Sequence, residues 1–399
     1  MLQAKTEDGE LVTLASLTRQ EIAMMKAKGK FFCPSCNQPV VAKAGTKLIP
    51  HFAHSSNTRC PSQEGGEGVY HEKGKLLLYQ WLKSQQLNVW LEAYIPEISQ
   101  RPDLLLQLKN KTIAIEYQCA RIPPELVAKR NRGYARAGIV PIWILGANTL
   151  KRYNGHQLKV DQFHLSFIHQ FSSDFPRTLY LFCPETQHFI LFQDLFFTTL
   201  HRASGKMNIR KLQAMNFLDL FHIAYFKQEQ LVPIWKREKR SFRLHIPRYA
   251  QGREFAWQQW LYVRNTNRQL LPSFIYLPID SQHMMKTPPW DWQSRICLDI
   301  IHPLTVGSTF HYESCTHILR SQMHKPSFFP LIKSAANPIT QYLQMLEQLH
   351  IIHKQSPTTY RKQMPIHFYE HLEEALDGDE RLMRQLIKKH DLFIIRHTN

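Results

Sequence analysis

Two acidic side chains in the stretch RPDLLLQLKNKTIAIEYQ, Asp103 and Glu116, are spaced so that they could bind one divalent cation together. The two apolar runs predict a β-hairpin with its turn at KNK. If Gln107 pairs with Thr112, Asp103 lies opposite Glu116 and both carboxylates meet on one face of the sheet. Such carboxylates repel each other unless a cation lies between them, and Mg²⁺ and Mn²⁺ prefer oxygen ligands. A turn one residue shorter would pair Asp103 with Tyr117 and separate the two acids.

Three further polar side chains could work beside this acid pair. Gln118 shares the strand face of Glu116, because side chains alternate along a strand, and its amide could orient a water molecule or a phosphate. Glu67 and His71 lie four residues apart, so a helix that starts early enough would place them on one face, as a third acid and a base or phosphate contact. The alternatives are that Glu67 caps this helix and that His71 is a surface residue.

Another pair, Arg130 and Tyr134, is separated by one helical turn in ELVAKRNRGYARA. Both side chains could face the acids of the sheet, and the Arg130 guanidinium could hold a phosphate through two hydrogen bonds. The alternative is a solvated charge on a basic helix. We predict that Arg130 and Tyr134 contact nucleic acid, together with Arg101 and Lys75.

A cluster of cysteine and histidine residues near the start of the chain has the spacing of a zinc site. It offers five candidate ligands for the four positions of a tetrahedral ion: Cys33, Cys36, His51, His54 and Cys60. We favour Cys33, Cys36, His54 and Cys60, with His51 as the alternative, because a hairpin over PVVAKAG and TKLIPHFAH would return the chain to the CPSC turn. A redox CxxC normally opens a helix, whereas a strand is expected here. The site should stabilise a small module and take no part in catalysis.

These side chains need a scaffold of helices and strands to position them. A helical apolar stripe over about 70–86 precedes the short strand NVWLEAY and the acid-bearing hairpin. Pro123–Pro124 can start a helix that Gly138 ends, and IVPIWIL follows as a buried strand. The order helix, three strands, helix, strand predicts an α/β (α+β) domain.

Composition restricts the class of protein further. The chain has 399 residues, enough for two or three domains, and a net charge of +18, which indicates nucleic acid or an acidic membrane surface as a partner. Its first residues lack the features of a signal peptide, and no apolar run reaches membrane-spanning length. We therefore expect a soluble cytoplasmic protein without membrane insertion. Seven cysteines, an odd number, fit metal ligation better than a disulfide framework.

The second half of the chain carries weaker signals. The segment WKREKRSFRLHIPRY, Trp235–Tyr249, interleaves basic and aromatic side chains, a pattern suited to single-stranded nucleic acid. Its predicted contacts are Lys239, Arg240 and Arg243. A charged surface loop over an ordinary core is the equal alternative. Two stretches near the end are helical by period, and Asp377-Gly378-Asp379 predicts a break in the second.

Several of these motifs occur in a fixed order: CPSC, HFAH and Cys60, then an E-x3-H-x3-K stretch, the acid pair and an R-x3-Y helix. In this order and spacing, roughly residues 1–150 resemble the CoiA competence protein family, and the rest resembles it by length and basic character. Arg101-Pro102-Asp103 and Glu116-Tyr117-Gln118 are also similar to the motif of the PD-(D/E)xK nuclease superfamily, whose core has the same order of elements.

The resemblance implies a multidomain protein. It would comprise a zinc-ribbon-like module at 1–64, a PD-(D/E)xK nuclease-like αβββαβ core at 65–150, and a basic C-terminal domain at 151–399 that is partly β and then mostly helical. It also implies metal-dependent cleavage of DNA taken up in competence, on branched or single-stranded recombination intermediates. Asp103 and Glu116 would hold Mg²⁺ or Mn²⁺.

Alternatives to a nuclease stay open. Gln118 stands where many superfamily members have lysine, which favours a non-cleaving, DNA-binding recombination-accessory protein that keeps the nuclease fold. A weaker alternative is an RNA-binding zinc protein. The partners that the resemblance implies are DNA, a recombinase and other competence proteins.

Overall fold

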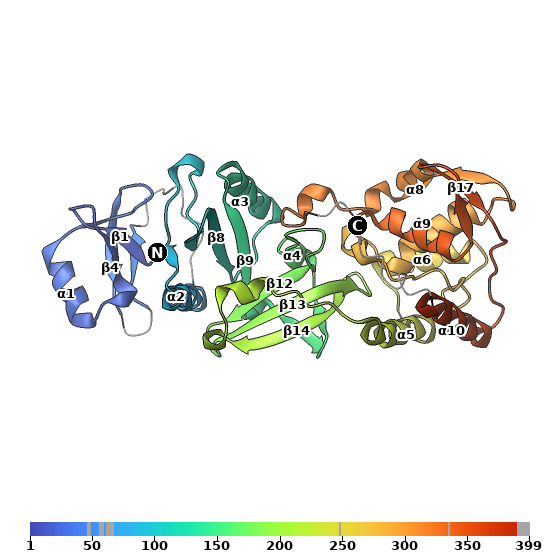
Figure 1. Ribbon diagram of the computed structural model, residues 1–399, viewed down its shortest axis with the longest axis horizontal. Coiled ribbons are helices and arrows are strands. Elements are labelled where there is room, and N and C mark those ends of the chain that lie inside the picture. The colour runs from blue at the N-terminus through green and yellow to red at the C-terminus, as the bar shows by residue number, and fades with distance from the viewer. Residues whose placement is uncertain (46–48, 56–59, 61–67, 247–248, 334–335, 389–399) are drawn as a thin grey trace.

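The computed structural model describes residues 1–45, 49–55, 60, 68–246, 249–333 and 336–388. They form three regions that follow one another along the long axis of the molecule (Figure 1). A small β-rich module at one end, in blue, adjoins a central sheet flanked by helices, and a mostly helical region lies at the other end. This mixed α/β architecture confirms the fold class predicted from the sequence.

The N-terminal module is an antiparallel sheet accompanied by helix α1. Its strand order is β2-β1-β3-β4-β5. Helix α1 begins after Thr18, which forms a reciprocal capping box with Glu21. The predicted hairpin is present as β4–β5, in which Val40 pairs with His54. The bounds are β1 Gln3–Lys5, β2 Leu11–Thr13, α1 Arg19–Lys28, β3 Phe31–Phe32, β4 Pro39–Lys43 and β5 His51–His54.

The central region begins with α2, β6, β7, β8, α3 and β9, in the predicted order. Gln107 pairs with Thr112, which confirms the register on which the acid pair depends. Lys109 has a φ of 50°, the left-handed conformation that a tight hairpin turn requires. The bounds are α2 Val69–Ser84, β6 Asn88–Leu91, β7 Leu104–Leu108, β8 Lys111–Gln118, α3 Pro124–Arg136 and β9 Val140–Gly146.

Helices α2 and α3 cover opposite faces of this sheet. Helix α2 packs so closely on Tyr117 of β8 that a Cβ added to Gly74 would lie 2.0 Å from the tyrosine ring. On the other face, Val127 of α3 packs with Trp143 of β9. Because side chains alternate along a strand, Glu116 points toward α3 while its neighbour Tyr117 points toward α2.

The sheet continues well beyond residue 150. Strand β12 pairs in parallel with β9, and the order within the described residues is β10-β11-β14-β13-β12-β9-β8-β7-β6. The boundary expected at 150–151 therefore falls inside the sheet and is corrected. Strand β9 needs β12, because its buried second edge would otherwise leave backbone groups without hydrogen bonds. The bounds are β10 Lys151–Asn154, β11 Gln157–Lys159, α4 Gln162–Leu165, β12 Thr178–Cys183, β13 His188–Phe197 and β14 Arg202–Lys211.

The C-terminal region packs helices and a small sheet, β15-β17-β16, around one hydrophobic core. Nowhere in the described residues does a helix combine the length and the apolar character needed to cross a membrane. The helices are α5 Gln228–Leu244, α6 Gly252–Tyr262, α7 Pro289–Arg295, α8 Tyr312–Leu319, α9 Pro338–Gln348 and α10 Leu372–Lys388. The strands are β15 Thr309–His311, β16 Ile352–Lys354 and β17 Thr359–Lys362.

Helix α10 runs without interruption through the position where the sequence predicted a break. Asp379 is buried there and accepts hydrogen bonds from Arg243 of α5 at 2.6 and 2.8 Å. Gly378 lies against Tyr369, so closely that a Cβ would be 1.9 Å from the phenol oxygen. The predicted break is wrong because these tertiary contacts outweigh the weak helix propensity of Gly and Asp.

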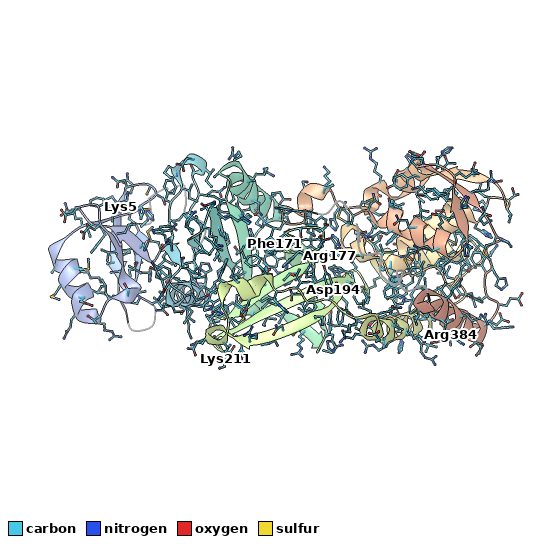
Figure 2. The ribbon with its side chains drawn as sticks, viewed as in Figure 1. Lys5, Phe171, Arg177, Asp194, Lys211 and Arg384 are labelled. Carbon is cyan, nitrogen blue, oxygen red and sulfur yellow. The ribbon has the colours of Figure 1, made fainter. Side chains whose placement is uncertain are left out.

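Polar contacts join the central sheet to the C-terminal region. Arg177, beside the start of β12, forms an ion pair with Asp280. Asp194 of β13 accepts a hydrogen bond from the backbone N–H of Phe226 at 2.7 Å. Figure 2 shows Arg177 and Asp194 near the junction of the two regions. Because both side chains are largely buried, they fix how the helical region meets the sheet.

Candidate active site

A cleft of about 640 Å³ opens where β7 begins and β8 ends, beside the first turn of α2 and the inner side of α3. Both predicted acids line it. Other lining residues used below are His71, Glu92, Arg101, Gln118 and Arg130. The predicted hairpin register thus brings Asp103 and Glu116 to one cavity, although Asp103 lies one residue before β7 and turns toward α2.

Asp103 is surrounded by hydrogen-bond donors and cations. Its Oδ2 accepts a hydrogen bond from the backbone N–H of Tyr117 at 2.8 Å and lies 3.3 Å from His71 Nε2. Its Oδ1 is 3.7 Å from Lys75 Nζ. Burial alone would raise the pKa of Asp103, but the charges of His71 and Lys75 and the Tyr117 N–H outweigh it and lower the pKa below its usual range. Asp103 is therefore ionised at any physiological pH.

Glu116 lines the cleft, and its two carboxylate oxygens differ in their hydrogen bonds. Oε1 accepts hydrogen bonds from Arg130 Nε at 3.0 Å, from Arg130 Nη2 and from the Tyr134 hydroxyl. Oε2 accepts no hydrogen bond from the described residues. Burial, helped by the negative charge of Asp103, raises the pKa of Glu116 to about 7 against the opposing charge of Arg130. Two carboxyl groups with opposite pKa shifts in one cavity are typical of active sites.

The raised pKa of Glu116 predicts a pH-dependent affinity for divalent cations. The pKa of this carboxyl is about 7 in the folded protein, above its ordinary value of 4.5. Its ionisation therefore lowers the stability of the fold as the pH rises from 4.5 to about 7. A cation must bind the ionised form. Between pH 6 and pH 8, the Mn²⁺ affinity should rise about tenfold, measured by titration calorimetry.

Tyr134→Phe supplies the control for this prediction. The Tyr134 hydroxyl favours the ionised carboxylate, so its loss should move the midpoint of the rise to higher pH. An Mn²⁺ affinity that is flat from pH 6 to pH 8 would contradict the assignment of Glu116 as a ligand that titrates in this range.

The other residues predicted for this site lie in different surroundings. His71 lines the cleft and stacks on the Tyr117 ring at 5.6 Å between centroids, so it is not a surface residue. Gln118 also lines the cleft, and its amide donates to the carbonyl of Ala120 at 2.7 Å. Glu67 lies outside the described residues.

Two predicted nucleic-acid contacts are corrected by burial. The Lys75 side chain is fully buried and its ammonium forms a hydrogen bond with Glu92, so it cannot reach a bound strand. Tyr134 is also fully buried, with its hydroxyl on Glu116. Arg101 and Arg130 do line the cleft. Glu92 was not predicted from the sequence, because its only signal there is a charge at the end of an apolar strand.

The four favoured zinc ligands come together in the N-terminal module. The ligand atoms of Cys33, Cys36, His54 and Cys60 all lie within 4.8 Å of one another. Sulfur ligands at about 2.3 Å from a tetrahedral zinc lie about 3.8 Å apart. Cys33 Sγ and Cys60 Sγ are 3.8 Å apart, and Cys36 Sγ is 3.3 Å from His54 Nε2. This cluster could bind zinc.

His51, the alternative ligand, points elsewhere. Its Nδ1 lies 2.9 Å from the carbonyl of Ile49. His51 and His54 stand at opposite ends of β5, and only His54 pairs with Val40 beside the CPSC turn. The strand register therefore places His54, and not His51, beside the three cysteines of the cluster.

The basic segment Trp235–Tyr249 is helical as far as Leu244. Its first part belongs to α5, an amphipathic helix whose Trp235 and Phe242 enter the C-terminal core. Lys239 and Arg243 are 2% and 1% exposed and pair with Asp379, which corrects their prediction as nucleic-acid contacts. Arg240 is exposed.

Comparisons with known proteins cover all three regions. Three family models match: the N-terminal domain of competence protein CoiA over residues 14–63, its nuclease-like domain over 67–225 and its C-terminal domain over 232–376. A competence protein CoiA from Bacillus subtilis (strain 168) is 34% identical over 272 residues, which are 67% of this chain and 71% of that protein. No solved structure matches the chain.

Proposed function

Because the chain belongs to the CoiA competence protein family, we propose that its nuclease-like domain hydrolyses DNA with the help of a divalent metal ion. One observation carries the proposal: Asp103, just before β7, and Glu116, on the neighbouring strand β8, line one cleft. A nuclease-like domain is established by the family match, and cleavage itself is the step that we add.

The donor set of the cleft fits a hard divalent cation. Asp103 is ionised, and Glu116 presents an oxygen that accepts no hydrogen bond from the described residues. These two carboxylates would hold Mg²⁺ or Mn²⁺, with water completing the shell. The ion, when bound, supplies a Lewis acid for the phosphate and a water of lowered pKa.

The residues of the chain would position the DNA phosphate for attack by water. Arg101 and Arg130 line the cleft beside the acids and supply positive charge for a phosphate. Gln118 lines it as well and can orient a water molecule, but it cannot add charge as lysine would. In the hydrolysis, the water oxygen forms a bond to phosphorus, one backbone phosphorus–oxygen bond breaks, and the leaving oxygen gains a proton.

The substrate and the biological setting belong to the same proposal. The relative is named a competence protein, and the chain carries a net charge of +18, which suits a polyanion. We place the activity in the cytoplasm, in the recombination of DNA taken up during competence. Single-stranded or branched intermediates would be cut there, beside a recombinase and other competence proteins.

A cleavage assay tests the proposal. Purified protein would be incubated with labelled single-stranded, duplex and branched DNA in Mg²⁺, Mn²⁺ or EDTA. We expect cutting in Mg²⁺ or Mn²⁺ and none in EDTA, with the fastest rate identifying the preferred DNA structure. Equal cutting with EDTA, or cutting of no DNA in either metal, would contradict a metal-dependent deoxyribonuclease.

A second candidate function is a non-cleaving, DNA-binding accessory protein that keeps the nuclease fold. Gln118 favours it, because many related nucleases have a positively charged lysine side chain at this position and glutamine is neutral. This candidate predicts salt-sensitive DNA binding that Asp103→Asn leaves unchanged, with cleavage by neither protein.

A further inference from the structure

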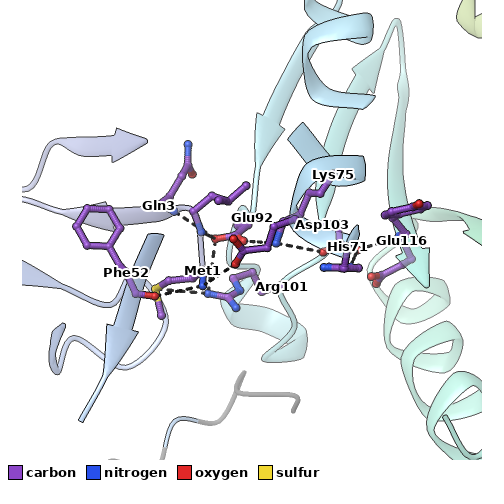
Figure 3. A network of polar contacts seen from close by, with 12 residues as sticks. Met1, Gln3, Phe52, His71, Lys75, Glu92, Arg101, Asp103 and Glu116 are labelled. Carbon is purple, nitrogen blue, oxygen red and sulfur yellow. Dashed lines mark hydrogen bonds and ion pairs between the residues drawn. The ribbon is translucent and has the colours of Figure 1, made fainter. Parts of the chain in front are cut away.

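Glu92 is a buried carboxylate that joins the N-terminal module to the candidate active site (Figure 3). It follows β6, is 3% exposed and has a φ of 50°. A non-glycine residue in this conformation is strained, and such strain gathers at functional sites. Its backbone N–H donates to the carbonyl of Asp103 at 2.9 Å, so the two acidic residues are tied together by the main chain.

One carboxylate oxygen of Glu92 contacts the N-terminal module and lies 4.0 Å from the Arg101 guanidinium of the cleft, and the other contacts α2. Oε2 accepts hydrogen bonds from the backbone N–H groups of Leu2 at 2.9 Å and of Gln3 at 3.3 Å, at the start of β1. Oε1 accepts a hydrogen bond from the ammonium group of Lys75, which belongs to α2. Strand β1 belongs to the module that carries the Cys33, Cys36, His54 and Cys60 cluster, so one side chain contacts both the module and the helix beside the cleft.

Glu92 and Asp103 are both near Lys75, and its ammonium lies closer to Glu92. Its ammonium is within hydrogen-bond distance of Glu92 but 3.7 Å from Asp103 Oδ1. The Lys75 side chain is fully buried, so water cannot screen its charge. When Glu92 holds the Lys75 ammonium, less of the negative charge of Asp103 is offset by Lys75. A divalent cation can then bind Asp103 with less competition from Lys75.

We propose that Glu92 is a positioning residue for the metal site, which holds Lys75 away from Asp103 while the N-terminal module is docked. The inference rests on the proposed function, because it takes Asp103 as a metal ligand. Docking of β1 orients the Glu92 carboxylate. The position of that carboxylate determines how close the Lys75 ammonium lies to Asp103, and therefore how strongly the two charges interact. The N-terminal module thereby tunes the affinity of the cleft for its cation.

The test measures Mn²⁺ binding, which needs no cleavage. Titrations of the zinc-loaded full chain, followed by the electron paramagnetic resonance signal of free Mn²⁺, would compare the wild type with Glu92→Gln. Loss of the Glu92 charge should let Lys75 turn to Asp103 and weaken Mn²⁺ binding about tenfold, as the loss of outer partners of metal ligands typically does. Exposed Glu97→Gln, the same chemical change outside this network, should bind Mn²⁺ like the wild type.

The double variant Glu92→Gln, Lys75→Gln separates positioning from simple damage to the fold. It removes one charge of each sign and should restore Mn²⁺ affinity to within about twofold of the wild type, whereas a purely structural loss would persist or worsen. Cys36→Ser, which undocks the module by breaking its cluster, should weaken Mn²⁺ binding in the same direction as Glu92→Gln.

Three results would overturn the proposal. They are an unchanged Mn²⁺ affinity in Glu92→Gln, a double variant that is not restored, and a Cys36→Ser variant that binds like the wild type. Asp103→Asn distinguishes this failure from failure of the proposed function. If Asp103→Asn loses Mn²⁺ while Glu92→Gln does not, only the role of Glu92 is wrong. If Asp103→Asn binds like the wild type, the metal site is wrong as well.

Discussion

Asp103→Asn should lower the rate of metal-dependent DNA cleavage on the order of 10³-fold, because the loss of one ligand charge removes about 4 kcal/mol of transition-state stabilisation. Asparagine keeps the shape and can still accept the hydrogen bond from the Tyr117 N–H. It carries no charge to offset that of the Lys75 ammonium, so the cleft should bind a divalent cation more weakly. Single-turnover rates with enzyme in excess, over a range of Mn²⁺ concentrations, measure the effect.

Controls for Asp103→Asn separate catalysis from DNA binding. Exposed Asp8→Asn, the same chemical change in the N-terminal module, should cleave like the wild type. In EDTA, Asp103→Asn should bind DNA at least as tightly as the wild type, because it removes a negative charge from the cleft. A variant that still cleaves within a few fold of the wild-type rate would exclude Asp103 as a metal ligand.

Loss of zinc should unfold the N-terminal module while leaving the central sheet intact. The module has a small core, centred on Leu14, Ile22, Phe31 and Phe52, and metal binding in such modules contributes roughly 10–16 kcal/mol to folding. Cys36→Ser removes one of four ligands. Hydrogen exchange should show lost protection in β4 and β5 and retained protection in β7 and β8, with zinc content reduced from one equivalent per chain.

A matched control for Cys36→Ser is Cys183→Ser, which removes a partly exposed thiol at the end of β12 in the central sheet. It should keep zinc and full protection in β4 and β5. If Cys36→Ser retained bound zinc and unchanged exchange in both strands, the cluster would not be the element that holds the module together.

Local patterns in the sequence predicted the register of the acid-bearing hairpin, but the two carboxylates do not share one face as predicted, because Asp103 turns toward α2 and Glu116 points toward α3. The period-2 alternation of the hairpin and its short turn determine the register, and the register brings Asp103 to the same end of the sheet as Glu116. The cysteine and histidine spacing predicted the cluster but left His51 and His54 open. That choice depends on which residue of β5 pairs beside the CPSC turn, a tertiary fact.

Long-range partners explain what sequence analysis could not reach. From the sequence, Lys239 and Arg243 look like surface charges. In the fold they are buried and form ion pairs with Asp379, which is far along the chain. Glu92 resembled an ordinary strand end, and its role appears only with the backbone of Leu2 and Gln3 against it. A buried charge is identified by its partner, and sequence spacing does not reveal partners in distant elements.

The most direct measurement of the central claim compares the wild type with Asp103→Asn, Glu116→Gln on one labelled DNA, recording binding and cleavage in the same samples with Mg²⁺. We predict that both proteins bind the DNA and that only the wild type cuts it. Cleavage by both would place the active site elsewhere. Binding by both with cleavage by neither would contradict the nuclease and leave a DNA-binding protein that keeps the fold.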